Sequence, residues 1–175
     1  MTAFPLRLPR AVEADPRAER LRAWLAAHAE PLRAGGEALC IATPLCDALA
    51  ASLRRAHGAG RLVRGLESVE PVLAAEERGQ RLADRRGEGP RGARISRLLL
   101  LANDGADRFY RQVEALLRRH GARVLALRVD AGAEALGALL FGEGRVARCV
   151  LIEHKEAVAD ALLALVAGAE GDAAG

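Results

Sequence analysis

The stretch Arg97–Gly105 constrains the fold of this chain more than any other, because it reads R-L-L-L-L-A-N-D-G. Four consecutive leucines and Ala102 form an apolar run that is bounded by turn-forming residues. A run this short predicts a strand that is buried on both of its faces. Asn, Asp and Gly each form turns easily, so the strand is expected to end there.

A helical pattern follows this turn, and a second apolar run follows the helix. The apolar positions share one helical face and are Phe109, Val113, Leu116, Leu117 and His120. Gly121 stands where a glycine commonly ends a helix. The apolar run Val124–Val129 then predicts the next strand. The three elements together predict a β-α-β unit.

The rest of the chain supplies similar but weaker signals. Helices are predicted to begin at Asp15-Pro16 and Thr43-Pro44, to include Val69 and Leu73, to cover Ala133–Leu140, and to include Ala157–Leu165. Short strands are predicted at Ala38–Ala42, Arg61–Arg64 and Ala147–Ile152. Strands that alternate with helices predict a three-layer α/β/α sandwich around a small mixed sheet. We expect this domain over residues 44–166, an N-terminal arm and helical extension over residues 1–43, and a disordered tail over residues 167–175.

Two boundaries stay open at this level. The helix after Arg64 can begin at Gly65, or later with Glu70 as its cap, because Pro71 is best tolerated in a first turn. The arm Met1–Ala14 is either partly disordered or draped on the domain. Residues 76–94 are charged and glycine-rich, so we expect a helical extension followed by a mobile loop that is either an RNA-backbone arm or a plain insertion.

Composition permits several partners but demands none. The net charge is +3, and Lys155 is the only lysine among the 26 basic residues, so this basicity reflects either an anionic partner or a codon-usage bias.

The three cysteines, Cys40, Cys46 and Cys149, have no second Cys/His pair to complete a zinc site, so we expect packed thiols and no metal. No apolar run is long enough for a bilayer span and no secretory leader is recognisable, so a cytoplasmic location is expected.

Four short motifs occur in order along residues 44–166. They are Gly60–Val69 (G-R-L-V-R-G-L-E-S-V), Leu98–Asp104 (L-L-L-L-A-N-D), Leu136-Gly137, and Val150–Glu153 (V-L-I-E). In this order the chain resembles the kink-turn-binding ribosomal-protein superfamily, which includes an archaeal large-subunit protein, eukaryotic large-subunit protein thirty and small bacterial proteins of the YlxQ type. The resemblance implies an α/β/α fold that binds structured RNA in a ribosome or RNA-maturation setting, without catalysis and without a cofactor.

The resemblance also implies where RNA would bind, namely at the start of the helix after Arg64 and at the turn around Gly144. The residues expected at this surface are Arg61, Arg64, Gly65, Glu67, Ser68, Gly144, Arg145, Val146 and Ala147. Arginines there would neutralise phosphates, and an apolar loop would contact unpaired bases. Glu67, Ser68 and Pro71 stand where RNA-binding members usually have Asn, Glu and Lys. The same residues also suit an ordinary solvated helix start, so both interpretations stay open.

Two other classes of function compete with RNA binding. Asp104 follows a buried strand, where open α/β sheets bind small molecules or nucleotides, but a carboxylate at a turn more commonly shapes the turn or caps a helix. No phosphate-binding loop or nucleophile motif accompanies it, which argues against an enzyme.

A protein–protein adaptor that keeps the fold without binding RNA is the other alternative. In that case Trp24 is either an anchor of its helix or an interface residue. The oligomeric state is left open.

Overall fold

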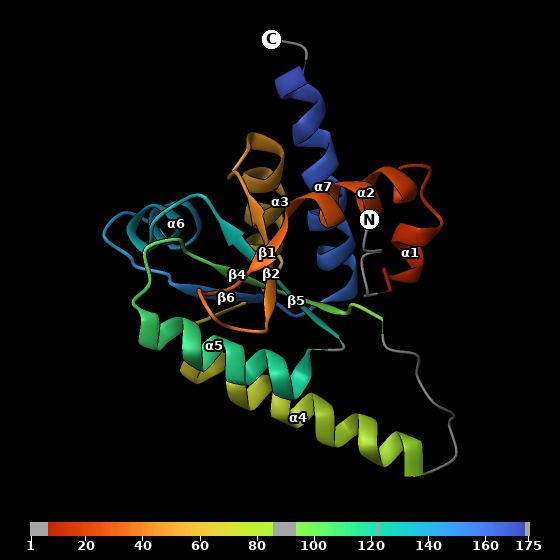
Figure 1. Cartoon of the computed structure of the whole chain (residues 1–175), viewed down its shortest axis with the longest axis vertical. Coiled ribbons are helices and arrows are strands. Elements are labelled where there is room, and N and C mark those ends of the chain that lie inside the picture. The colour runs from red at the N-terminus through yellow and green to blue at the C-terminus, as the bar shows by residue number, and fades with distance from the viewer. Residues whose placement is uncertain (1–6, 86–93, 122, 174–175) are drawn as a thin grey trace.

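The protein is described by a computed structural model that covers residues 7–85, 94–121 and 123–173. Six strands form one open mixed sheet in the order β1-β2-β5-β4-β6-β3, with helices on both faces (Figure 1). The strands are β1 (Ala29–Pro31), β2 (Leu39–Thr43), β3 (Leu62–Arg64), β4 (Arg97–Leu101), β5 (Val124–Val129) and β6 (Cys149–Ile152). The helices are α1 (Arg10–Glu13), α2 (Ala18–His28), α3 (Asp47–Gly58), α4 (Leu66–Arg85), α5 (Asp107–His120), α6 (Ala133–Phe141) and α7 (Lys155–Ala173). The chain is therefore an α/β sandwich, as the alternation of patterns predicts.

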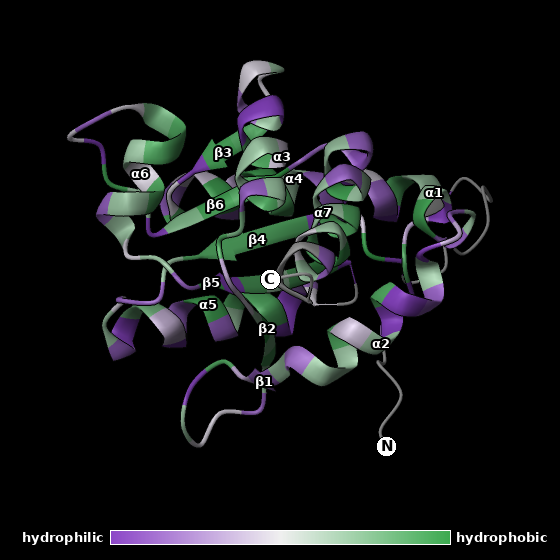
Figure 2. Ribbon diagram, turned by 90° about the horizontal axis from the view of Figure 1, so that it is seen from above, coloured by the Kyte–Doolittle hydropathy of each residue, from purple (hydrophilic) through white to green (hydrophobic). Residues whose placement is uncertain are grey.

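The centre of the sheet is parallel and its edges are antiparallel. Strands β2, β5 and β4 run in the same direction, whereas β1, β6 and β3 each run antiparallel to the neighbour with which they pair. Helix α5 connects β4 to β5, so the predicted β-α-β unit is confirmed. In Figure 2 the hydrophobic colouring runs along β4, the strand with four leucines.

Strand β4 explains why four leucines follow one another. Leu98 and Leu100 pack in the core that α3, α6 and α7 share, and Leu99 and Leu101 pack in the core beneath α4 and α5. All four side chains are fully buried. Alternate residues of a strand face opposite sides, so a strand between two helical layers needs apolar residues at every position. Figure 1 shows α4 and α5 on one side of the sheet and the other helices on the opposite side.

The N-terminal segment is more than a helical extension, because its two strands continue the sheet. Strand β2 pairs in parallel with β5, Ile41 facing Leu127, and β1 pairs with β2. Leu8 and Val12 are fully buried in the same core as α7, so the arm from residue 7 onward is draped on the domain. Residues 1–6 lie outside the described ranges. The sheet and the core therefore run across the expected boundary at residues 43 and 44.

Several expected helix ends are wrong. Helix α4 begins at Leu66 and contains Pro71, so the later start at Glu70 does not occur. Burial of Val69 and Leu73 favours the earlier start, although Pro71 has no backbone N–H and the helix therefore lacks one hydrogen bond. Asp15 does not cap α2, which begins at Ala18. Its carboxylate instead accepts hydrogen bonds from the Arg17 guanidinium and backbone N–H, and these bonds lower its pKa to about 2.

Two further predictions about segment ends need correction. Thr43 ends β2, and α3 begins only at Asp47. Residues 167–173 of the expected tail are helical, because α7 continues to Ala173, and residues 174–175 lie outside the described ranges. In α7, Gly168 approaches Cys46 so closely that a Cβ atom there would overlap the sulfur. The first half of residues 76–94 extends α4 as predicted, whereas the expected mobile loop at residues 86–93 lies outside the described part of the chain.

Candidate functional site

A hollow of about 630 Å³ opens where the first turns of α4 and α5 meet the loop before β6. We call it the Gly65 concavity. Its walls are Arg64, Gly65, Leu66, Glu67, Ser68, Phe109, Gln112, Gly144, Arg145, Val146, Ala147, Arg148 and Cys149. The structure thus brings together two segments that are about eighty residues apart in the sequence.

Gly65 makes the abrupt change from β3 to α4 possible. Its φ of +90° lies in the left-handed region, which a residue with a Cβ atom adopts only at a cost. The Gly65 N–H donates to the carbonyl of Cys149 at 2.9 Å, and the Gly65 carbonyl accepts from the backbone N–H groups of Ser68 and Val69. The start of α4 is therefore tied directly to β6, beside the opposing loop.

The opposing loop is fixed by backbone contacts with α6. Arg145 N–H donates to the Gly142 carbonyl at 3.1 Å, and Ala147 N–H donates to the Ala133 carbonyl at 2.9 Å. A Cβ atom on Gly137 would overlap the carbonyl oxygen of Arg145, so a glycine is required for α6 to pack this closely on the loop. The Leu136-Gly137 motif thus has a physical reason, which is to hold the loop in place.

The concavity is electropositive. Arg64, Arg145 and Arg148 line it, all three are exposed, and Glu67 is the one acidic residue among the lining residues. None of the ion pairs found within the described residues involves any of these three arginines. Three guanidinium groups around one hollow therefore have no carboxylate partner in the part of the chain that the structure describes.

Arg61 does not belong to this group, although it was predicted to. Its guanidinium pairs with Glu156 of α7 at 3.2 Å, beside a different hollow that Arg55 and Asp160 also line. Arg61 and Arg64 lie three residues apart on an extended segment, so their side chains leave on opposite faces. The other predicted residues line the same hollow and are Arg64, Gly65, Glu67, Ser68 and residues 144–147. Leu66, which was not predicted, lines it as well.

Phe109 and Gln112 of α5 also line the concavity, and sequence reasoning missed them. Phe109 was assigned to the buried face of its helix, but its side chain is only half-buried. The preceding turn fixes its position: the Tyr110 hydroxyl donates to the Ala102 carbonyl at 2.6 Å and accepts from Gly105 N–H. Phe109 and Gln112 are three residues apart in the first part of the helix, and this spacing indicates that they share a helical face.

Asp104 has a structural role in this fold. Its carboxylate accepts the backbone N–H of Ala133 at 3.0 Å, which caps α6. The neighbouring Asn103 donates to the Asp130 carboxylate at 2.9 Å. A hollow of about 360 Å³ lies nearby at the ends of β2 and β5, and Asp104 is not among its lining residues. The helix-capping interpretation of Asp104 therefore fits the geometry.

The thiols and Trp24 are packing groups. Cys40 and Cys149 are buried, and burial raises the pKa of Cys40 to about 11 and that of Cys149 to about 12. Within the described residues no three His, Cys, Asp or Glu side chains gather as metal ligands would. Trp24 is partly buried against the main core and stacks on His28, with ring centroids 4.0 Å apart. This contact fits the role of an anchor for α2.

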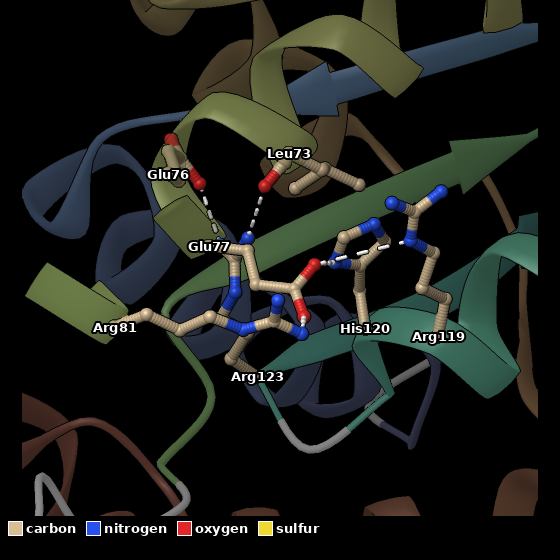
Figure 3. Close-up of polar contacts among 7 residues, drawn as sticks. All are labelled: Leu73, Glu76, Glu77, Arg81, Arg119, His120 and Arg123. Atoms are coloured by element: carbon tan, nitrogen blue, oxygen red, sulfur yellow. Dashed lines mark hydrogen bonds and ion pairs between the residues drawn. The ribbon is translucent and has the colours of Figure 1, made fainter. Parts of the chain in front are cut away.

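A second charged cluster lies further along α4 and at the end of α5 (Figure 3). Glu76 pairs with Arg97 at 2.9 Å and with Arg123 at 2.5 Å, and Arg123 also donates to the Leu73 carbonyl at 2.8 Å. Glu77 lies 3.5 Å from the buried ring of His120. Burial lowers the pKa of His120, against the opposing effect of the Glu77 charge. We call these residues the Glu76 cluster.

Comparisons with known proteins name no family for this chain. No protein-family profile matches the sequence, and no curated protein matches it. Among solved structures, one matching chain is a protein of unknown function from Bacillus halodurans, with 19% identity and a TM-score of 0.43. The match covers 70% of this chain and 98% of that chain. Separately, none of the described helices has the length and apolar character required to cross a membrane.

Proposed function

We propose that the protein binds structured RNA in the Gly65 concavity, without catalysis, in a ribosome or RNA-maturation setting. The observation that carries the proposal is the set of three exposed arginines around one hollow, Arg64, Arg145 and Arg148, for which the described residues supply no carboxylate partner. Elsewhere in the described chain, Arg61 and Arg123 are paired with acids, whereas exposed arginines such as Arg54 and Arg108 take part in none of the ion pairs found there. The Gly65 concavity differs in that three such arginines line one hollow. Guanidinium groups that lack an internal partner are suited to phosphate oxygens, which they bind through charge-assisted hydrogen bonds.

The remaining walls suit the other parts of an RNA fold. Val146 is 45% exposed and faces the same hollow as the half-buried ring of Phe109. Such apolar surfaces are suited to bases that have left the stack, as in bulges and sharp bends. The Glu67 carboxylate accepts hydrogen bonds, and the Gln112 amide both donates and accepts them, so both suit base edges. A bent RNA with unpaired bases matches these walls better than a plain duplex does.

Titration of the purified chain with a kink-turn RNA and with a plain duplex, at about 50 and about 200 mM salt, tests the proposal. We expect the kink-turn RNA to bind at least tenfold more tightly than the duplex. Equal, weak binding of both RNAs with the same steep salt dependence would reject recognition of structured RNA. The adaptor alternative predicts instead a protein partner that co-purifies with the chain after nuclease treatment.

A further inference from the structure

The guanidinium of Arg64 lies over an aromatic ring that belongs to a different element. Arg64 ends β3, and its guanidinium carbon is 5.0 Å from the centre of the Phe141 ring. A guanidinium over a ring face is attracted by the ring quadrupole, and the planar contact restricts the rotamers of a long side chain. Arg64 is exposed and would otherwise sample many rotamers in solvent.

The Phe141 ring also contacts a second ring. The His57 ring of α3 meets Phe141 edge-on, with centroids 5.1 Å apart and an interplanar angle of 89°. Phe141 is half-buried and packs against the main core. His57, Phe141 and Arg64 thus form a contact cluster to which three separate elements contribute, and Arg64 lines the Gly65 concavity.

Phe141 also stands at the root of the loop that carries Arg145. It is the last residue of α6, and Gly142 and Gly144 follow it with φ values of +105° and +80°. Gly137, one turn earlier in α6, packs against the Arg145 backbone. The end of α6 therefore contacts Arg64 through Phe141 and leads directly into the loop that carries Arg145.

We propose that Phe141 is a positioning residue that holds the Arg64 guanidinium ready for an RNA phosphate. This inference rests on the proposed function of the concavity. A side chain that is already restricted loses less conformational entropy on binding, so its charge contributes more to affinity. The value of an exposed cation–π contact corresponds to an affinity two- to fivefold tighter than that of a freely moving arginine.

A double-mutant cycle tests this coupling in the full chain with the kink-turn RNA as ligand. Phe141→Leu is expected to weaken binding about two- to fivefold, Phe141→Tyr to leave it unchanged, and Phe141→Leu to have no further effect when Arg64→Ala is present. Phe109→Leu is the matched control. Phe109 lines the concavity and makes no cation–π contact with the described arginines, so its effect should add to that of Arg64→Ala.

The outcomes separate this inference from the function on which it rests. If Arg64→Ala leaves RNA binding unchanged, the proposed function fails. If Arg64→Ala weakens binding but Phe141→Leu has the same effect in both backgrounds, positioning by Phe141 is wrong. A spectroscopic measurement on the free wild-type protein does not depend on whether a variant folds. The side-chain protons of Arg64 should show upfield ring-current shifts in its NMR spectrum. Random-coil shifts for these protons would overturn the inference.

Discussion

Two charged regions lie along α4 and α5, the Glu76 cluster and the Gly65 concavity, and they differ in how their charges are used. In the Glu76 cluster the arginine Arg123 is buried and each charge has a recorded partner. In the Gly65 concavity the arginines are exposed and no carboxylate partner is found among the described residues. Paired charges hold two helices and a sheet together, whereas charges left without an internal partner remain available to a ligand. We infer that the same residue type, arginine, has a structural role in the Glu76 cluster and the proposed binding role in the Gly65 concavity.

The largest expected effect concerns the Glu76 cluster. Replacing Glu76 by Ala leaves Arg123 buried and without its carboxylate, and removal of one partner from a buried pair is strongly destabilising. Because Glu76 is partly exposed, we expect a loss of about 2–4 kcal/mol in the free energy of unfolding, measured by denaturant titration. Glu70→Ala, an exposed position on the same helix, is the control and should change stability by less than about 0.5 kcal/mol. A loss below about 1 kcal/mol for Glu76→Ala would show that the cluster does not hold α4 in place.

The next effect concerns the concavity and should appear in binding alone. Arg64→Ala is expected to weaken binding of the kink-turn RNA about tenfold, because it removes a charge-assisted contact worth about 1.5 kcal/mol. Its free energy of unfolding should fall by no more than about 1 kcal/mol, since the side chain is exposed and loses one exposed cation–π contact with Phe141. A clear loss of stability with unchanged RNA affinity would reverse the roles assigned to the two regions.

A smaller effect is the response of the Glu76 cluster to pH. Burial lowers the pKa of His120 below its ordinary value of 6.5, with Glu77 and Glu76 opposing this shift and Arg123 and Arg119 adding to it. A folded-state pKa below the unfolded value means that the unfolded chain takes up the proton more readily. The contribution of the neutral, buried His120 to the free energy of unfolding is therefore complete above pH 6.5. It is lost as the pH falls through the lowered folded-state pKa. Denaturant midpoints at about pH 7.5 and about pH 5.5 should differ less in His120→Gln than in wild type. An identical pH response in both proteins would contradict the assignment.

The smallest effect belongs to the rim of the same cluster. Arg81 pairs with Glu77 one helical turn away at 2.7 Å, and the Arg81 side chain is largely exposed. Exposed pairs of this kind contribute little, so Arg81→Ala should change the free energy of unfolding by less than about 0.5 kcal/mol. A loss above about 1 kcal/mol would mean that the exposed charges, and not only the buried ones, hold the cluster together.

The sequence was sufficient to predict the central elements, because their patterns reflect burial directly. The four leucines of β4 alternate between two cores, and that arrangement requires the uninterrupted apolar run from which the strand was predicted. The apolar face of α5 was predicted for the same reason. Strand β1 was missed, since Ala29–Pro31 has three residues without an apolar run, and only its pairing with β2 defines it. The C-terminal end of α7 was predicted to be a disordered tail because its glycines are typical of non-helical segments. The helix forms there nevertheless, and α7 packs on α3.

The candidate site divides in the same way. The resemblance implied that Gly65 and the 144–147 loop form one surface, and both line the same hollow. Arg61 was included because it is close in sequence, although side chains three residues apart on a strand face opposite sides. The role of Phe109 was hidden, since an apolar residue on a helix face has the same pattern whether it completes a core or borders a hollow. The contacts among His57, Phe141 and Arg64 join three elements, so no local pattern could predict them.

The salt dependence of RNA binding tests the central claim most directly. A variant with Ala at Arg64, Arg145 and Arg148 is compared with a matched control that has Ala at Arg54, Arg55 and Arg61, which lie on α3 or face α7. Each lost phosphate contact should reduce the slope of log affinity against log salt by about 0.7–0.9 units. We therefore expect the slope for the kink-turn RNA to fall by about 2–3 units in the first variant and to stay unchanged in the control. Equal slopes in the two variants would contradict binding of RNA by the Gly65 concavity.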